Sequence, residues 1–400
     1  MKLAIASGKG GTGKTTVAVN LAALLAARGH HVALADCDVE EPNAHLFLPV
    51  EWKTREQCTL PVPRMNETLC LGGACRRCVD ACRFKALAFM GDAVLDFPDL
   101  CHGCGLCALV CPTGAMTTTT RLVGEVRGGI APIRPAMRNA TANGTERPHE
   151  EAGAATPFAR PNAVPVLHFR DGVLRIGEAM ATPLIKAVKD MPPQRIPQSG
   201  PDAGSGTAPE PCAFIIRDCP PGVACAAINA VHDADLLLLV AEPSPFGLHD
   251  LRLAVSLARH LRLPHAVVLN RFGMGNGTEA GTPQPGAMPT AAAPAPALAR
   301  DPVSEWAARE GVPLLGVIPF SRAAAECGAT GSLMHDAAPE VRAAYALLAE
   351  AVEAFARGGN DTGSPWHGPE LAGLKDMVEA ARNTEDAGSA ASAKEHACGR

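Results

Sequence analysis

Three features are missing from this sequence, and each absence excludes a class of protein. No apolar run reaches the roughly 18 residues of a membrane-spanning helix, and the first apolar segment ends at Ser7 and Gly8, before a secretion signal could form. Positive charge is not in excess, since 36 Lys and Arg stand against 41 Asp and Glu. The sequence shows neither a basic patch nor a terminal basic amphipathic helix. We therefore expect a cytoplasmic protein with no nucleic-acid partner and no membrane insertion.

Cysteine, in contrast, is abundant, with 15 residues in a chain of 400. This length corresponds to two or three domains at roughly 150 residues each, and 47% hydrophobic residues suffice for a core. Because the cytoplasm keeps thiols reduced, metal ligation or redox chemistry explains so many cysteines better than disulfides do.

Short apolar runs alternate with helix-like segments at both ends of the chain, which is typical of a buried, mostly parallel sheet. Strands are predicted over 2–6, 31–35, 213–216, 235–241, 266–269 and 314–318, and helices over 15–28, 248–261 and 339–357. The segment from Cys70 to Cys111 interrupts this pattern with eight cysteines and a strand-like piece at 93–97. The sequence thus predicts an α/β domain that carries a small inserted module.

A glycine-rich segment follows the first strand and precedes the first helix. Gly8-Lys9-Gly10-Gly11-Thr12-Gly13-Lys14-Thr15 matches the P-loop pattern G-x-x-x-x-G-K-[ST]. In such a loop, backbone N–H groups and the helix N-terminus cradle phosphates, Lys14 reaches the β- and γ-phosphates, and the Thr15 hydroxyl binds Mg²⁺. A glycine turn without a ligand would not need Lys-Thr at the start of the helix.

The extra lysine in this loop extends the similarity. The segment from Lys9 to Thr16 resembles the deviant Walker A motif of the MinD/ParA superfamily of P-loop ATPases, which includes the nitrogenase iron protein. The resemblance implies that residues 8–16 bind ATP or ADP with Mg²⁺. It also implies a nucleotide-dependent homodimer in which Lys9 reaches the phosphate bound by the partner.

Three further segments match this superfamily. Asp36-Cys37-Asp38 resembles its switch I, so that Asp38 would position or activate the attacking water, although a helix cap would also explain it. Asp218-Cys219-Pro220-Pro221-Gly222 resembles Walker B, which implies that Asp218 holds Mg²⁺. Asn270 matches the adenine-reading position, where a turn asparagine is the alternative. The predicted catalytic residues are therefore Lys9, Lys14, Asp38 and Asp218.

Two features near these segments have no assigned role. Arg217 interrupts an apolar strand directly before Asp218. The segment from Glu242 to Asp250 resembles a loop-to-helix segment of the iron–sulfur branch of the superfamily.

The second cysteine run has the complete spacing of bacterial ferredoxins. In Cys101-x2-Cys104-x2-Cys107-x3-Cys111-Pro112, three thiolates bind one [4Fe–4S] cluster and the fourth ligates a second cluster. Zinc, the main alternative, commonly uses two separated C-x2-C pairs.

The first run, Cys70-x4-Cys75-x2-Cys78-x3-Cys82, is longer in its first gap and lacks the proline. Its first three cysteines have plant-type spacing, yet the rest of the run and the neighbouring complete run favour two [4Fe–4S] clusters. One cluster is then held by Cys70, Cys75, Cys78 and Cys111, and the other by Cys82, Cys101, Cys104 and Cys107. A displaced Cys70 would make the first cluster labile or three-iron.

A metal site at Cys219 and Cys225 between two subunits is a further alternative.

The expected organisation is an ATPase domain in two parts, residues 1–60 and 165–357, around an α+β bacterial-type ferredoxin insert at 61–120. Residues 121–164 are expected to be a linker, 192–211 and 273–302 low-complexity loops, and 358–400 a disordered tail. This doubly wound P-loop protein, similar to the Mrp and iron protein groups, would couple ATP binding and hydrolysis to electron transfer toward a redox partner. The alternatives are an ATPase that delivers iron–sulfur clusters to client proteins and a positioning ATPase in which the clusters are structural.

Overall fold

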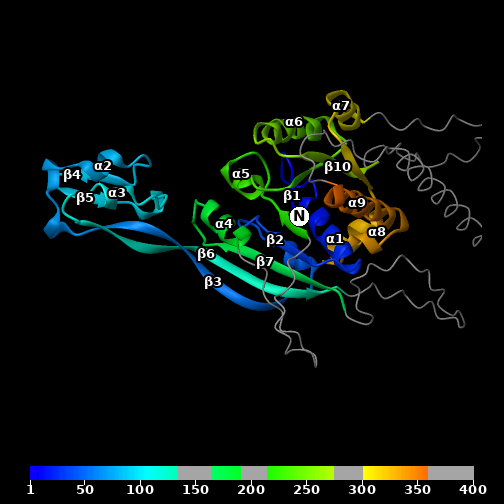
Figure 1. Ribbon diagram of the computed structural model, residues 1–400, viewed down its shortest axis with the longest axis horizontal. Helices are drawn as coiled ribbons and strands as arrows, with labels where there is room; N and C mark the ends of the chain where they lie inside the picture. The colour runs from blue at the N-terminus through cyan, green and yellow to red at the C-terminus, as the bar shows by residue number, and fades with distance from the viewer. Residues whose placement is uncertain (134–163, 191–213, 274–300, 359–400) are drawn as a thin grey trace, which may run out of the picture.

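A nine-stranded sheet forms the centre of the protein in the computed structural model, which describes residues 1–133, 164–190, 214–273 and 301–358. The strand order is β11-β10-β9-β1-β8-β2-β7-β6-β3 (Figure 1). The strands are β1 (Lys2–Ala6), β2 (Val32–Asp36), β3 (Glu51–Met65), β6 (Met116–Pro132), β7 (Val166–Leu174), β8 (Phe214–Asp218), β9 (Leu236–Ala241), β10 (His265–Phe272) and β11 (Leu314–Pro319). All pairs from β11 to β7 are parallel, whereas β6 is antiparallel to β7 and β3. The expected mostly parallel α/β fold is confirmed.

Helices cover both faces of this sheet (Figure 1). One core contains residues of α1 (Lys14–Ala27), α8 (Arg322–Ala329) and α9 (Pro339–Gly358). The other contains residues of α4 (Thr182–Asp190), α5 (Cys225–Val231), α6 (Pro245–His260) and α7 (Pro302–Glu310). Side chains alternate between the faces of each strand, so that Leu3 and Ile5 enter the first core and Ala4 and Ala6 the second. The expected helices and parallel strands are confirmed to within a few residues.

The prediction of a linker over residues 121–164 is wrong for residues 121–132, because these residues belong to β6. Strands β3 and β7 were not predicted from the sequence. Two prolines, Pro61 and Pro63, lie in β3, where they are tolerated because β3 is the edge strand and needs no N–H donors on its outer side. The rest of the expected linker, the expected loop at 192–211, most of the loop at 273–302 and the tail beyond 358 lie outside the described residues.

The cysteine-rich segment forms a separate module beyond the sheet edge (Figure 1). We call the paired outer parts of β3 and β6, residues 59–65 and 116–122, the stalk. The module between them contains α2 (Arg77–Ala81), the hairpin of β4 (Leu87–Met90) and β5 (Ala93–Asp96), and α3 (Leu106–Leu109). Its small core is built from Cys78, Leu87, Val94 and Met116. The module therefore projects from the edge of the nucleotide domain on two continuous strands.

Candidate nucleotide and cysteine sites

The P-loop joins β1 to α1, and two of its glycines are required by their surroundings. A Cβ on Gly8 would lie 2.1 Å from the Asp250 carbonyl oxygen, and one on Gly13 would lie 2.2 Å from Asn270 Nδ2. Gly13 also has φ of +90°, which only glycine adopts readily. Gly10, in contrast, has open space around it. The loop is thus packed against α6 and the end of β10.

Four predicted catalytic and metal-binding side chains meet at this loop. Burial raises the pKa of Asp218 to about 7, although the Thr15 hydroxyl and the Lys14 ammonium lower it and Asp38 raises it. Neither oxygen of this buried carboxylate has a hydrogen-bond partner of normal geometry among the described residues. A buried carboxylate whose oxygens have no hydrogen bond of normal geometry, beside a hydroxyl and a lysine, fits a divalent cation on a nucleotide phosphate.

Asp38 lies at the same site but is only partly buried. Burial raises its pKa to about 6, Lys14 lowers it, and the neighbouring Glu40 and Glu41 raise it. The side chain therefore changes charge near neutral pH, in the range where a general base works best.

Asp36, two residues earlier, has a positioning role that the sequence analysis did not assign. Its Oδ1 accepts a hydrogen bond from the Asp38 N–H at 3.1 Å, and its Oδ2 accepts from the N–H groups of Asn43 and Ala44 at 3.0 Å each. Burial, followed by the charge of Asp218, raises its pKa well above the usual range. Asp36 thus fixes the loop from residue 38 to residue 44, which carries Asp38.

Asn270 supports the P-loop directly. Its side chain is buried, and Nδ2 donates to the Thr12 carbonyl oxygen at 2.8 Å. The amide nitrogen that was expected to read adenine is therefore engaged by the loop that precedes Lys14.

Lys9 lies at the rim of the site, within reach of a carboxylate of its own chain. Its Nζ is 3.5 Å from Oε2 of Glu242, whose Oε1 is 2.6 Å from Nη1 of Arg271. Glu242 begins the segment that the sequence analysis left without a role, and Ser244 caps α6 in that segment by accepting from the Gly247 N–H. Contacts with the P-loop give this segment a structural explanation.

Arg217 now also has an explanation. Its Nη1 and Nη2 bind the two oxygens of Asp233 at 2.7 and 3.1 Å, and Lys189 and Lys2 bind the same carboxylate at 2.8 and 2.9 Å. Although burial raises the pKa of Asp233, the bonds from Arg217, Lys189 and Lys2 hold it well below the usual range. The cluster ties β8, α4 and β1 to the loop before β9.

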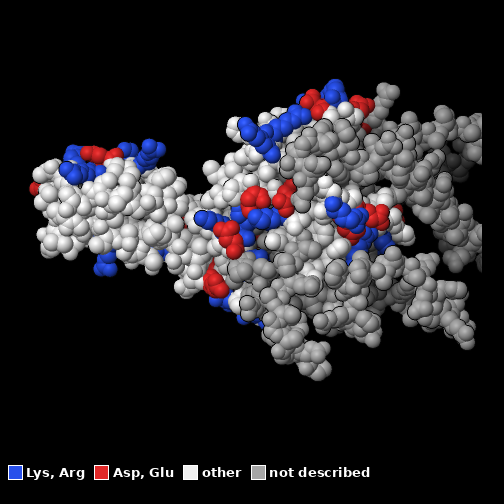
Figure 2. Space-filling view, in the orientation of Figure 1, with Lys and Arg blue, Asp and Glu red and all other residues white. Residues whose placement is uncertain are grey.

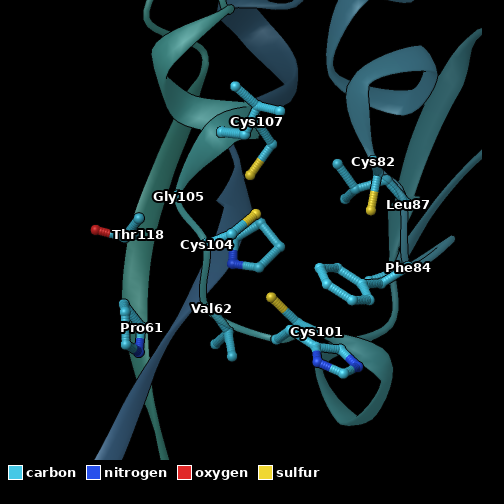
Figure 3. Close-up of a pocket in the computed structure, with 14 residues that line it drawn as sticks. Pro61, Val62, Cys82, Phe84, Leu87, Cys101, Cys104, Gly105, Cys107 and Thr118 are labelled. Atoms are coloured by element: carbon cyan, nitrogen blue, oxygen red, sulfur yellow. The ribbon is translucent and has the colours of Figure 1, made fainter. Parts of the chain in front are cut away.

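The eight cysteines of the two runs line two separate cavities in the module. Cys82, Cys101, Cys104 and Cys107 line the inner pocket, with sulfur atoms pointing into one space (Figure 3). Cys70, Cys75, Cys78 and Cys111 line the outer pocket. Both sets are the groups of four expected from the spacing, and all eight are free thiols.

The inner pocket lies nearer the sheet, because Pro61, Val62 and Thr118 line it, whereas Met65 and Ala115 line the outer pocket. In the described part of the chain, no three His, Cys, Asp or Glu side chains converge on a point that would bind a single metal ion. The sulfurs of each set instead surround a cavity, as the ligands of a cubane cluster do.

The alternative metal site at Cys219 and Cys225 has a mixed environment. Cys219 is fully buried, and burial raises its pKa well above the usual range, whereas Cys225 is exposed at the start of α5. A buried protonated thiol is a poor metal ligand.

In the residues that the structure describes, no helix is long and apolar enough to cross a membrane.

Comparisons with known proteins identify the nucleotide domain. Residues 3–284 match the CobQ/CobB/MinD/ParA nucleotide binding domain. An uncharacterized protein of Methanocaldococcus jannaschii is 28% identical over 277 residues, which are 69% of this chain and 80% of that protein. The iron–sulfur cluster carrier protein of Pyrococcus abyssi is 54% identical over 50 residues, 12% of this chain and 17% of that protein. The structure of the cell division ATPase MinD of Pyrococcus furiosus aligns over 88% of this chain and 98% of its own, with 20% identity and a TM-score of 0.43.

Proposed function

Because the chain belongs to the CobQ/CobB/MinD/ParA nucleotide-binding family, we propose that it is an ATPase that couples its nucleotide state to electron transfer through two [4Fe–4S] clusters. The observation that carries the proposal is the separation of eight cysteines into two cavities on a stalk. This stalk grows from the sheet edge next to the carboxylates of the nucleotide site.

At the nucleotide site, each residue has a role that follows from its position. In this proposal Lys14 binds the phosphates, and Thr15 and Asp218 hold Mg²⁺, which would neutralise charge that develops on the transferred phosphoryl group. Asp38, once deprotonated, accepts a proton from the attacking water or orients it. Lys9 would exchange Glu242 for a phosphate of the partner subunit when a homodimer closes.

In this proposal, a buried ion pair between Arg127 on β6 and Asp171 on β7 connects the nucleotide site to the stalk. Asp171 on β7 pairs in register with Asp36 on β2. Its carboxylate oxygens accept hydrogen bonds from Arg127 Nε and Nη2 at 2.8 and 2.5 Å. The Arg127 guanidinium in turn lies 4.4 Å from the centre of the Trp52 ring on β3. Through Arg127, both strands that lead into the stalk are therefore held to Asp171, which lies in register with Asp36 at the nucleotide site.

A second set of ion pairs links the module to the end of the sheet through Asp99, whose side chain is 82% exposed. Asp99, two residues before Cys101, lies 3.7 Å from Arg121 on β6 and 3.5 Å from Arg175 after β7. The buried Glu178 pairs with both arginines. A change in the angle of β6 would consequently shift the segment that carries the ligands of the inner pocket.

The cysteine pockets fit iron–sulfur clusters by their donor set, because each offers four free thiols around one cavity. Each bound cluster would accept and release one electron. A second candidate function, the delivery of clusters to client proteins, is favoured by the exposed Cys104 at the inner pocket and by the local likeness to iron–sulfur cluster carrier proteins.

The test is anaerobic EPR during redox titration of the full chain, with iron and sulfide counted, without nucleotide and with Mg-ATP. We expect two reversible [4Fe–4S] signals whose midpoint potentials or line shapes change with Mg-ATP. Lys14→Ala should keep the iron content and lose the nucleotide effect. Clusters that ignore Mg-ATP would refute the coupling, and rapid loss of iron to an apo-ferredoxin would support cluster delivery instead.

A further inference from the structure

The two cysteine pockets differ in the charge of the side chains around them. Arg76 and Arg77 line the outer pocket together with its four cysteines, and no carboxylate does so among the described residues. The residues that line the inner pocket include no Lys, Arg, Asp or Glu. Figure 2 shows Lys and Arg, interleaved with Asp and Glu, along the edge of the module that carries α2, while most of the remaining visible surface of the module is uncharged.

The position of one of these arginines is held by packing, since the guanidinium of Arg76 lies 5.4 Å from the centre of the Phe89 ring. A cluster bound by four thiolates is anionic and gains one further negative charge on reduction. Cations beside it stabilise the reduced state more than the oxidised state. Arg76 and Arg77 therefore raise the potential of a cluster in the outer pocket.

The hydrogen bonds to cysteine sulfur also differ between the two pockets, and they too favour the reduced state at the outer pocket. At the outer pocket, the Gly72 N–H donates to Cys70 Sγ and the Met116 N–H donates to Cys111 Sγ, both at 3.4 Å. The Thr113 hydroxyl lies 3.7 Å from the same Cys111 sulfur. Such donors also stabilise added negative charge.

At the inner pocket, the Gly103 N–H donates to Cys101 Sγ at 3.4 Å. Burial raises the pKa of the Cys107 thiol there, although a hydrogen bond from the backbone of Ala108 to its sulfur lowers it. The other walls of this pocket are largely apolar and include Val62, Ala86 and Leu87. Apolar surroundings make added negative charge costly, so a cluster there has the lower potential.

From these two independent differences we infer that electrons pass from the inner pocket outward to the outer pocket, and that Arg76 and Arg77 set this direction. The inference rests on the proposed function in requiring both clusters. In the step, the inner cluster is oxidised by one electron and the outer cluster is reduced by one, with no bond made or broken. A one-electron reductant of low potential supplies the electron, and a one-electron acceptor removes it at the far end of the module.

Three double variants of the full chain test this direction in anaerobic EPR titrations with dithionite, without nucleotide. Arg76→Gln with Arg77→Gln removes both cations from the outer pocket. Lys53→Gln with Arg55→Gln is the matched control, because these two cations are exposed like Arg76 and Arg77 but lie on β3 outside the stalk and line neither pocket. Arg76→Lys with Arg77→Lys retains the charge.

In the first variant, we expect the higher of the two midpoint potentials to fall and the lower one to stay. At fixed potential, the reduced-to-oxidised ratio of the outer cluster should drop about tenfold, or ~59 mV for one electron. The control should shift far less, and the lysine variant should retain the wild-type potential. A fall of the lower potential, or no difference between variant and control, would overturn the inference.

The same samples separate this inference from the proposed function. Iron and sulfide contents that fall short of two clusters per chain would defeat both. Two full clusters that do not respond to Mg-ATP would defeat the coupling alone, since the order of the two potentials is measured in nucleotide-free protein.

Discussion

The ion pair between Arg127 and Asp171 gives the sharpest test of how the stalk is anchored. The Asp171 side chain is completely buried and that of Arg127 is 17% exposed. Arg127→Met keeps most of the side-chain volume and leaves the carboxylate without its bidentate partner. Removal of one member of a buried pair costs about 3–5 kcal/mol of unfolding free energy, and loss of the contact with Trp52 adds about 0.5–1 kcal/mol.

The same pair of strands offers a matched control. Arg55 on β3 and Glu125 on β6 form an ion pair at 3.4 Å, but their side chains are 62% and 38% exposed. Water screens such a pair, so Arg55→Met should cost no more than about 1 kcal/mol. A third variant, Arg127→Met with Asp171→Asn, removes both charges and should recover much of the loss, because an unpaired buried charge is the main penalty.

Urea unfolding of the three variants, followed by circular dichroism, measures these differences. If Arg127→Met costs no more than Arg55→Met, the argument that this buried pair anchors the stalk is wrong. A functional readout comes from the same variant. Arg127→Met should still bind ATP but lose the response of its EPR signals to Mg-ATP.

Three further predictions concern the nucleotide site. Gly8→Ala should abolish binding of a fluorescent ATP analogue, because its Cβ would strike the Asp250 backbone. Asn270→Ala should weaken ATP and GTP binding alike, about fivefold for one lost hydrogen bond of ~1 kcal/mol; a selective loss of ATP would instead favour base recognition. ATP hydrolysis should fall as the pH drops through about 6, because burial raises the pKa of Asp38 and protonation removes its charge. Asp38→Asn should abolish most of the activity, and an unchanged rate would exclude this role.

Local sequence patterns predicted the cysteine sets and every parallel strand except β7, but not the antiparallel edge of the sheet. Strands such as β9 are buried on both faces and are almost wholly aliphatic, so they stand out in the sequence. The edge strand β3 mixes exposed charges with Pro61 and Pro63, and β6 contains Thr117–Thr120 and several glycines. These strands form because they pair with each other and with β7, and that pairing is not encoded in either segment alone.

In the candidate sites, too, features set by local spacing could be predicted from the sequence, whereas contacts between distant residues could not. Spacing along the chain sufficed to group the eight cysteines, because the ligands of each cluster lie mostly in one short run. The partners of Arg127, Arg217 and Lys9 lie far away in sequence, so no local pattern names them. Arg217 did leave a signal, since an arginine within an aliphatic strand needs a buried carboxylate, here Asp233.

The place of the insertion supports the proposed coupling between the nucleotide site and the cysteine module. The module enters the chain after β2, and the connecting loop is held by Asp36 through the N–H groups of Asn43 and Ala44. A short 3₁₀ helix, Ala44–Phe47, then leads to the start of β3 at Glu51. We therefore expect movement of the loop that carries Asp38 to displace the first strand of the stalk. The second strand, β6, is held by Arg127 to Asp171, which lies in register with Asp36. Both strands of the stalk would therefore move with these two carboxylates. An insertion at the β11 edge would lie across the sheet from these carboxylates and would lack this connection.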